Sequence, residues 1–192
     1  MRSQANRGRD FETLLNMTNS MYQKNGLACV HKVPTEFLPL RDARGKIVGC
    51  KVEHKSCVDY LGRYRGNPVA VEAKHTEQGR IQFDRVEPHQ AAYMDDFCMA
   101  PGAVGLVVVS FGLRRFYAVP WPFWKAARDV WLSGRKRGVS VSVGSHGMFW
   151  DTPGAASVTP EQMLPEWEVK PETRLFLPYL RIIDKMDWRM VL

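Results

Sequence analysis

The chain has 192 residues, of which 45% are hydrophobic and 24% are charged. This is an ordinary globular composition, and it excludes intrinsic disorder, collagen and coiled coil as the main class. The longest apolar stretch, residues 103–109, is far shorter than the roughly 20 residues that a membrane helix needs. The first nine residues are charged and lack the apolar run of a signal peptide. No two of the four cysteines form a C-x-x-C pair, so we expect a cytoplasmic protein with reduced thiols and no membrane segment.

Positive charge is concentrated in the first part of the chain. The formal net charge is +7, and residues 1–80 contain 14 Lys and Arg against 8 Asp and Glu. Residues 81–192 contain 13 against 12 and are close to neutral. A concentrated basic region is typical of proteins that bind a polyanion, most often nucleic acid. A protein whose surface is merely basic is the alternative on charge alone.

Hydrophobic periodicity and turn residues predict the elements in chain order. We expect a helix over 10–24, with Asp10 as its N-cap and Gly26 after its end, and then a strand over 27–33. Residues 36–55 predict a long hairpin, and residues 57–74 predict a second one with a turn at 62–67. The later elements are a helix that begins at Pro88, strands at 103–111 and 114–119, a helix at 122–132 and a returning segment at 175–183.

This order of elements indicates an α/β fold built on a mixed central sheet. The chain has no internal repeat and no linker, so we expect residues 1–192 to form a single domain that starts with a basic N-terminal arm at residues 1–9. Residues 135–173 are rich in Gly, Ser and Pro. They receive no assignment.

Three residues of the second hairpin form a pattern with chemical meaning. Glu72 and Lys74 share one face of their strand because side chains alternate, and Val69, Val71 and Ala73 take the other face, toward the core. Asp59 lies on the partner arm, so its carboxylate can approach that of Glu72. Two close carboxylates suit Mg²⁺ or Mn²⁺. A neighbouring ammonium can orient a water or stabilise developing phosphate charge, so the pattern predicts a metal-dependent phosphodiesterase centre.

The Glu-x-Lys pattern alone is weak, because residues 53–55 and 168–170 match it too. Glu72 is favoured because its strand is hydrophobic and pairs with a strand that carries an Asp. It also has Gln90 on the inward face of the following helix and Glu12 early on the first helix. We interpret Glu53 and Lys55 as surface groups. The five histidines have no spacing typical of catalytic zinc sites.

Several ordered strings resemble the RecU family of Holliday-junction resolvases within the PD-(D/E)xK nuclease superfamily. The resemblance covers residues 5–132 and resumes near 175–185. The strings are Asn6-Arg7-Gly8 with Phe11-Glu12, Asn16 with Thr18-Asn19, His31-Lys32 with Pro34-Thr35, Ser56 with Asp59-Tyr60, Tyr64 with Gly66, Glu72-Ala73-Lys74 with Thr76, His89-Gln90 with Met94, and Pro178-Tyr179-Leu180. The family usually has a hydroxyl residue two positions before the Asp, where this chain has Cys57.

The resemblance implies a restriction-endonuclease-like sheet flanked by helices, with the hairpin at 36–55 as a projecting stalk. It implies Mg²⁺, or Mn²⁺ as a substitute, bound by Asp59, Glu72 and the carbonyl of Ala73. Lys74 would act on the attacking water or the transition state, with Glu12 and Gln90 as supporting active-site residues. The family acts as a homodimer that nicks two opposing strands of a four-way junction in recombination and repair.

We expect phosphate contacts from the basic residues of the arm, the stalk and the hairpin strands. These are Arg7, Arg9, Lys32, Arg41, Arg44, Lys46, Arg63 and Arg65. The setting would be the bacterial cytoplasm, or the host cytoplasm for a phage protein, and other recombination proteins are possible partners. Two alternatives stay open: another PD-(D/E)xK nuclease, or a non-catalytic DNA-binding recombination factor.

Overall fold

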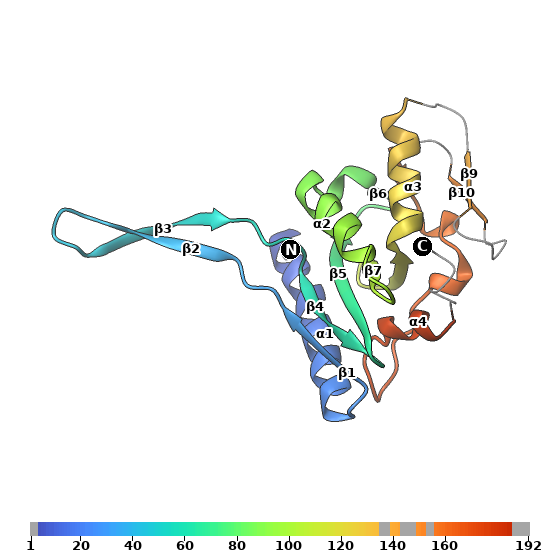
Figure 1. Ribbon diagram of the computed structural model, residues 1–192, viewed down its shortest axis with the longest axis horizontal. Coiled ribbons are helices and arrows are strands. Elements are labelled where there is room, and N and C mark those ends of the chain that lie inside the picture. Colours follow the sequence, from blue (N-terminus) through green and yellow to red (C-terminus); the bar gives the residue numbers. More distant parts are fainter. Residues whose placement is uncertain (1–3, 135–138, 143–148, 153–155, 186–192) are drawn as a thin grey trace.

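A five-stranded mixed sheet forms the centre of the protein (Figure 1). The structure is a computed structural model that describes residues 4–134, 139–142, 149–152 and 156–185. The strand order is β1-β4-β5-β7-β8, in which β5 and β7 run parallel and the other neighbours run antiparallel. The strands are β1 (Ala28–Lys32), β4 (Tyr60–Tyr64), β5 (Asn67–Thr76), β7 (Val104–Phe111) and β8 (Arg115–Pro120). The expected α/β class with a mixed, helix-flanked sheet is confirmed.

Helices cover both faces of the sheet, which explains why its central strands are almost wholly apolar. Helix α1 (Gln4–Lys24) lies on one face, where Phe11 meets the ring of His75 on β5. Helix α2 (Pro88–Cys98) lies on the other, where Gln90 contacts Glu72, and α3 (Trp121–Leu132) also packs on β7. Every residue of β7 is buried, as in strands that are covered on both faces.

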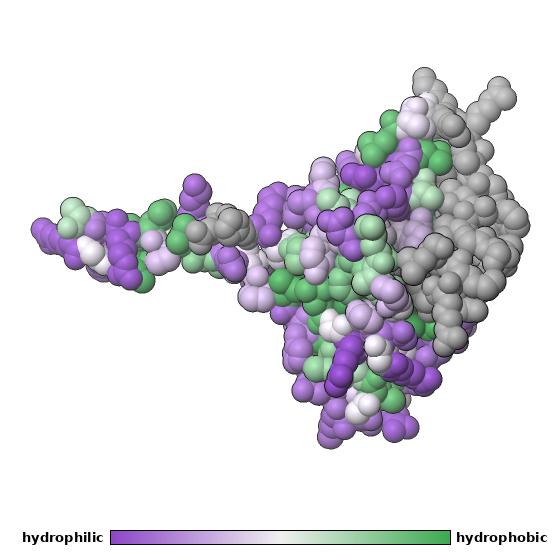
Figure 2. Space-filling model, viewed as in Figure 1, coloured by the Kyte–Doolittle hydropathy of each residue, from purple (hydrophilic) through white to green (hydrophobic). Residues whose placement is uncertain are grey.

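The predicted long hairpin is confirmed as a two-stranded ribbon that projects from the body (Figure 1). It consists of β2 (Glu36–Arg41) and β3 (Ile47–His54). The carboxylate of Asp42 shapes its turn, since Oδ1 accepts hydrogen bonds from the N–H groups of Arg44 (2.9 Å) and Lys46 (3.0 Å). Residues 36–51 are all exposed, and apolar side chains lie among the polar ones along the ribbon (Figure 2). Residues 36–55 are called the stalk from here on.

The last third of the chain completes the core on the far side from the stalk. It contains short strands β9 (Val139–Ser142), β10 (Phe149–Thr152) and β11 (Ser157–Val158), of which β11 pairs with β6 (Ile81–Gln82). The rings of Trp150 and Trp167 are fully buried and lie 4.9 Å apart, edge to face. The predicted return of residues 175–183 is confirmed, because Thr18 Oγ1 on α1 accepts a 3.1 Å hydrogen bond from the N–H of Leu177. A short helix, α4 (Ile182–Lys185), follows.

Two predicted boundaries are wrong. Helix α1 begins at Gln4 instead of Asp10, because residues 5–9 include good helix formers that continue the helix outward past the candidate cap. The second hairpin turns through Arg65 and Gly66 only, with φ of 48° and 87°, instead of through residues 62–67. Positive φ at both central residues is typical of the tight type I′ turn, which matches the twist of the flanking strands. Among the helices that the structure describes, none is long and apolar enough to cross a membrane.

Candidate active site

Asp59 lies next to Glu72 because of the register between β4 and β5. Tyr60 pairs with Val71, so the residue before β4 comes to lie beside the continuation of β5. Asp59 Oδ2 accepts a 2.8 Å hydrogen bond from the N–H of Ala73, and the Asp59 carbonyl accepts one from Val33. The two hydrogen bonds fix both the backbone and the carboxylate of Asp59 at the point where β4 begins.

The carbonyl of Ala73 faces the same edge. In an extended strand the N–H and C=O of one residue point to the same side, so the Ala73 carbonyl shares the side of the N–H that Asp59 binds. The ladder between β4 and β5 ends at Val71, and beyond that point β5 faces the Asp59 side chain instead of a paired strand. Asp59, Glu72 and the Ala73 carbonyl therefore offer oxygen atoms in one place.

Glu72, Lys74 and Gln90 form a closed set of hydrogen bonds. Glu72 Oε1 accepts a 2.7 Å hydrogen bond from Gln90 Nε2 and lies 2.5 Å from Lys74 Nζ. Lys74 Nζ also donates to Gln90 Oε1 at 3.2 Å. Each member is thus held by the other two, on the face of β5 that α2 covers.

Gln90 is fixed by the start of its own helix. It is the third residue of α2, and its Oε1 accepts a 2.9 Å hydrogen bond from the N–H of Glu87, the N-cap residue. This is one half of a capping box, in which side chains at the two positions satisfy backbone groups of each other. The cap thereby aims the amide of Gln90 at Glu72.

The second oxygen of Glu72 lacks a hydrogen-bond donor within the described residues. The Glu72 side chain is fully buried, and within the described part of the chain its Oε2 has no hydrogen bond. Burial raises the pKa of Glu72 to about 7; Lys74 acts against that shift, and the adjacent Asp59 carboxylate adds to it. The prediction that Val69 and Val71 face the core is confirmed, and α2 buries the Glu72 side of β5 as well. A buried carboxylate oxygen without a hydrogen-bond donor is energetically unfavourable, and a bound cation would relieve that cost.

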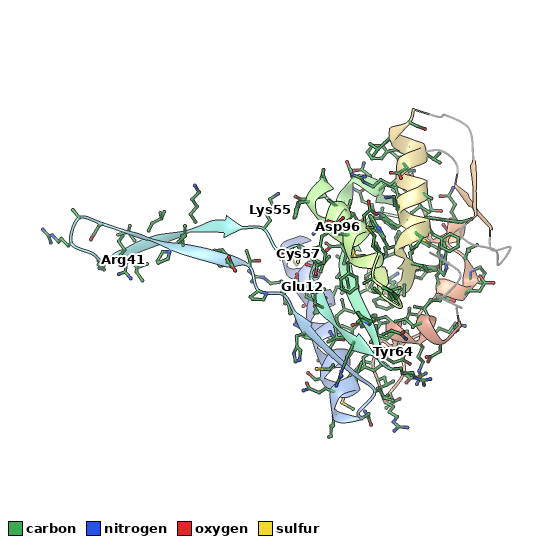
Figure 3. All side chains as sticks on the ribbon, viewed as in Figure 1. Glu12, Arg41, Lys55, Cys57, Tyr64 and Asp96 are labelled. Atoms are coloured by element: carbon green, nitrogen blue, oxygen red, sulfur yellow. The ribbon has the colours of Figure 1, made fainter. Side chains whose placement is uncertain are left out.

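Glu12 lies nearby but is not part of this set. Its carboxylate forms an ion pair with Lys32, and its backbone carbonyl accepts a 3.4 Å hydrogen bond from the hydroxyl of Tyr60. Burial raises the pKa of Tyr60, and the charges of Glu12 and Asp59 raise it further, which places both carboxylates around that hydroxyl. Cys57, which stands where a hydroxyl residue was expected, is half-buried and interacts with Tyr93 on α2. Figure 3 shows Glu12 and Cys57 where the stalk joins the body.

The basic residues expected to contact DNA lie in separate places. Arg9 is exposed on α1, and Lys32 is engaged by Glu12. The side chain of Arg7 lies outside the described residues. The others lie at the tip of the stalk (Arg41, Arg44, Lys46) and at the far end of β4 from Asp59 (Arg63, Arg65). Arg65 forms a 3.3 Å ion pair with Asp184, so part of this basic set is neutralised within the chain.

Sequence reasoning did not identify how the end of β5 is held. His75 Nδ1 lies 3.1 Å from the hydroxyl of Ser110, and its Nε2 lies 2.9 Å from the carboxylate of Glu77. No sequence signal joins His75 to Ser110, because their contact depends on the pairing of β5 with β7. In the ranges that the structure describes, no three His, Cys, Asp or Glu side chains converge as a metal site. A cation here would depend on two carboxylates and a carbonyl.

Comparison with known proteins assigns the chain to a family. The model of the family Recombination protein U (RecU) matches residues 6–143, well over half of the chain. The chain belongs to the RecU family. The matched range contains the RecU-like strings up to Met94, including Asp59, Glu72 and Lys74.

Individual relatives carry the same family name. The Holliday junction resolvase RecU of Streptococcus pneumoniae (strain Taiwan19F-14) is 34% identical over 122 residues, which cover 60% of this chain and 62% of that protein. The Holliday junction resolvase RecU of Streptococcus gordonii is 35% identical over 127 residues, with 62% of each chain covered. The chain therefore spans less than two thirds of these relatives. Among solved structures, Hjc, a Holliday junction resolvase of Archaeoglobus fulgidus, is similar with a TM-score of 0.39 and 13% identity over 60% of this chain and 73% of that one.

Proposed function

We propose that this RecU-family chain is an endonuclease that depends on a divalent cation, Mg²⁺ or in its place Mn²⁺, and resolves four-way DNA junctions by paired nicks. The observation that carries the proposal is the buried, unpartnered Oε2 of Glu72 beside Asp59. A hard cation would satisfy that oxygen, and the Asp59 carboxylate and Ala73 carbonyl would complete an oxygen set of the kind that such cations prefer. The residues present therefore fit the cation.

The side chains divide the chemistry between them. A divalent cation held by Asp59, Glu72 and the Ala73 carbonyl would supply Lewis-acid polarisation of the scissile phosphate and a lower pKa for the attacking water. Lys74 holds a positive charge beside the same oxygens, where it orients that water or stabilises the charge that develops on the phosphate. Gln90 holds Glu72 and Lys74 in place through its two hydrogen bonds.

Junction selectivity would come from shape and phosphate contacts. The stalk supports this because it is exposed and carries Arg41, Arg44, Lys46 and Lys51, a charge suited to the phosphate-lined centre of a junction, whereas Lys55 at its base pairs with Glu87. The similarity to Holliday junction resolvases of the RecU family supports the same substrate. Paired nicks on opposing strands need two active sites, so the proposal includes a homodimer.

The direct test is incubation of the protein with a synthetic four-way junction and with a linear duplex of the same sequence, with and without Mg²⁺. The proposal expects symmetric nicks in the junction only when Mg²⁺ is present, and little cutting of the duplex. Equal cutting of both substrates would favour another PD-(D/E)xK nuclease. Tight junction binding with no cutting in Mg²⁺ or Mn²⁺ would favour a non-catalytic DNA-binding factor.

A further inference from the structure

A polar cleft of about 430 Å³ opens beside the candidate active site. Its walls come from the first part of α1, the end of β5, the loop that follows β5, and the segment around β6. Glu12 and Ala73 line it, whereas Asp59, Glu72 and Lys74 do not. The cleft therefore adjoins the oxygen-rich edge at Ala73 and extends from there on the α1 side. Any ligand that reaches the Ala73 carbonyl and extends in this direction enters the cleft.

The charges of the cleft leave two guanidinium groups unneutralised. Of its carboxylates, Glu12 is paired with Lys32, and Glu77 lies 2.9 Å from His75. Arg80 and Arg85 also line the cleft and are exposed, and in the part of the chain that the structure describes neither guanidinium has an ion pair or a hydrogen bond. With Lys32 balancing Glu12, the two arginines face one remaining carboxylate, Glu77, so the cleft has a net positive charge and suits an anion.

Both arginines extend from backbone that is already fixed. The hydroxyl of Thr76 donates to the Arg80 carbonyl (3.2 Å) and accepts from the N–H of Gln78 (3.1 Å), so the loop is closed on itself. Arg85 ends a short 3-10 helix between two fully buried residues, Phe83 and Val86. An anion that binds here orders two side chains and leaves the backbone as it is, which keeps the entropic cost of binding low.

We propose that Arg80 and Arg85 bind phosphates of the DNA strand that is cut, next to the scissile phosphate on its Ala73 side. The inference rests on the function proposed above. A guanidinium offers paired donors that match phosphate oxygens, and a DNA strand places further phosphates along the same path as the scissile one. The contact is to the backbone, so it positions the strand without reading its sequence.

The first test measures junction binding in EDTA over a range of salt for Arg80→Gln and Arg85→Gln. Each variant should bind roughly tenfold more weakly and reduce the slope of log K against log salt by about 1, equally for junctions of different sequence. Arg80→Lys keeps the charge and should keep the slope.

Arg174→Gln is the matched control, because Arg174 contacts Asn25 just beyond the opposite end of α1, and its slope should equal that of the wild type. Unchanged slopes for Arg80→Gln and Arg85→Gln would overturn the inference.

The second test identifies the phosphates. Neutral methylphosphonate linkages are placed one at a time on both sides of the cut in the cleaved strand. Wild type and Arg174→Gln should lose affinity at the contacted linkage, whereas the variant that lacks the contacting arginine should lose none there. Equal losses for all proteins at every linkage would refute the contact. Failure of the wild type to cut the junction in Mg²⁺ would instead refute the proposed function, and the binding results would stand independently of it.

Discussion

Gln90 Nε2 donates a 2.7 Å hydrogen bond to Oε1 of the fully buried Glu72. Because Gln90 also belongs to the capping box of α2, one side chain connects the start of a helix to the central carboxylate of the site. The geometry of the site and the stability of α2 are therefore linked through this residue.

Replacement of Gln90 by Ala should reduce both properties at once. Loss of the cap and of two buried hydrogen bonds should lower the free energy of unfolding by about 1–3 kcal/mol, and junction cleavage should fall because Glu72 and Lys74 lose their common partner. Urea unfolding and single-turnover cleavage measure the two effects. Gln23→Ala, at an exposed position on α1, is the control and should leave both near the wild-type values. A stable but slow variant would contradict the link to the cap.

Lys74→Ala should lower the rate of cleavage at saturating Mn²⁺ by at least about a hundredfold, as the loss of one stabilising group in a preorganised site does. Removal of the ammonium also removes a group that lowers the pKa of Glu72, so the titration is run at pH 8.5 to favour the ionised form of that carboxyl in both proteins. The Mn²⁺ midpoint should then move little. A shifted midpoint with an unchanged saturated rate would assign Lys74 to the metal instead of to the chemistry. Lys170→Ala, from the Glu-x-Lys match at 168–170, is the control.

Stability without metal should fall as the pH rises through the titration of Glu72. Burial raises the pKa of Glu72 from its ordinary 4.5 to about 7, so between these values the folded protein keeps a proton that the unfolded chain has released. The free energy of unfolding should decrease over this interval by about 1–3 kcal/mol. Glu72→Gln cannot ionise, so its advantage over the wild type in EDTA should grow from pH 5 to pH 8 in urea unfolding. Parallel pH profiles would show that Glu72 carries no such penalty.

Removal of the stalk tip should reduce junction selectivity and leave the fold intact. Residues 40–47 are exposed and contact only the stalk itself within the described structure, so their deletion, closed with Gly-Gly, removes Arg41, Arg44 and Lys46 without opening the core. Junction affinity should fall toward that for linear duplex, so the ratio of junction to duplex dissociation constants, at one fixed salt concentration, should rise toward one. A well-folded deletion variant with an unchanged ratio would place selectivity elsewhere, in the spacing of two active sites.

Local sequence features predict where the site lies in the fold, but not the hydrogen bonds that hold its side chains. Strand alternation and a short hairpin are enough to place Asp59, Glu72 and Lys74 on neighbouring strands, and Pro88 marks the helix that carries Gln90. The bonding of Gln90 to Glu72 depends on α2 lying across β5, which is a tertiary arrangement without a local signal. The burial of Glu72 has the same cause, because a strand read by itself shows one polar face.

The structure of the region around Trp150 and Trp167 could not be predicted from the sequence for another reason. Its aromatic residues, Phe149, Trp150 and Trp167, are few and lie far apart or side by side, so they form no period of 2 or 3.6. In the structure Trp150 on β10 donates to the carbonyl of Gln162 and lies edge to face against Trp167, at the end of a short 3-10 helix. The burial of these two rings depends on tertiary packing, which has no local signal in the sequence.

The central claim is that Asp59 and Glu72 hold the cation on which cleavage depends, while affinity comes from dispersed basic residues. The measurement is single-turnover cleavage of a synthetic four-way junction in Mg²⁺, with junction binding in EDTA, for Asp59→Asn and Glu72→Gln. Glu168→Gln, from the competing Glu-x-Lys match, is the control. We expect both site variants to lose cleavage by at least about a thousandfold and to bind within a few-fold of the wild type, with the control unchanged. Turnover near the wild-type rate by either site variant at saturating Mg²⁺ would contradict the assignment.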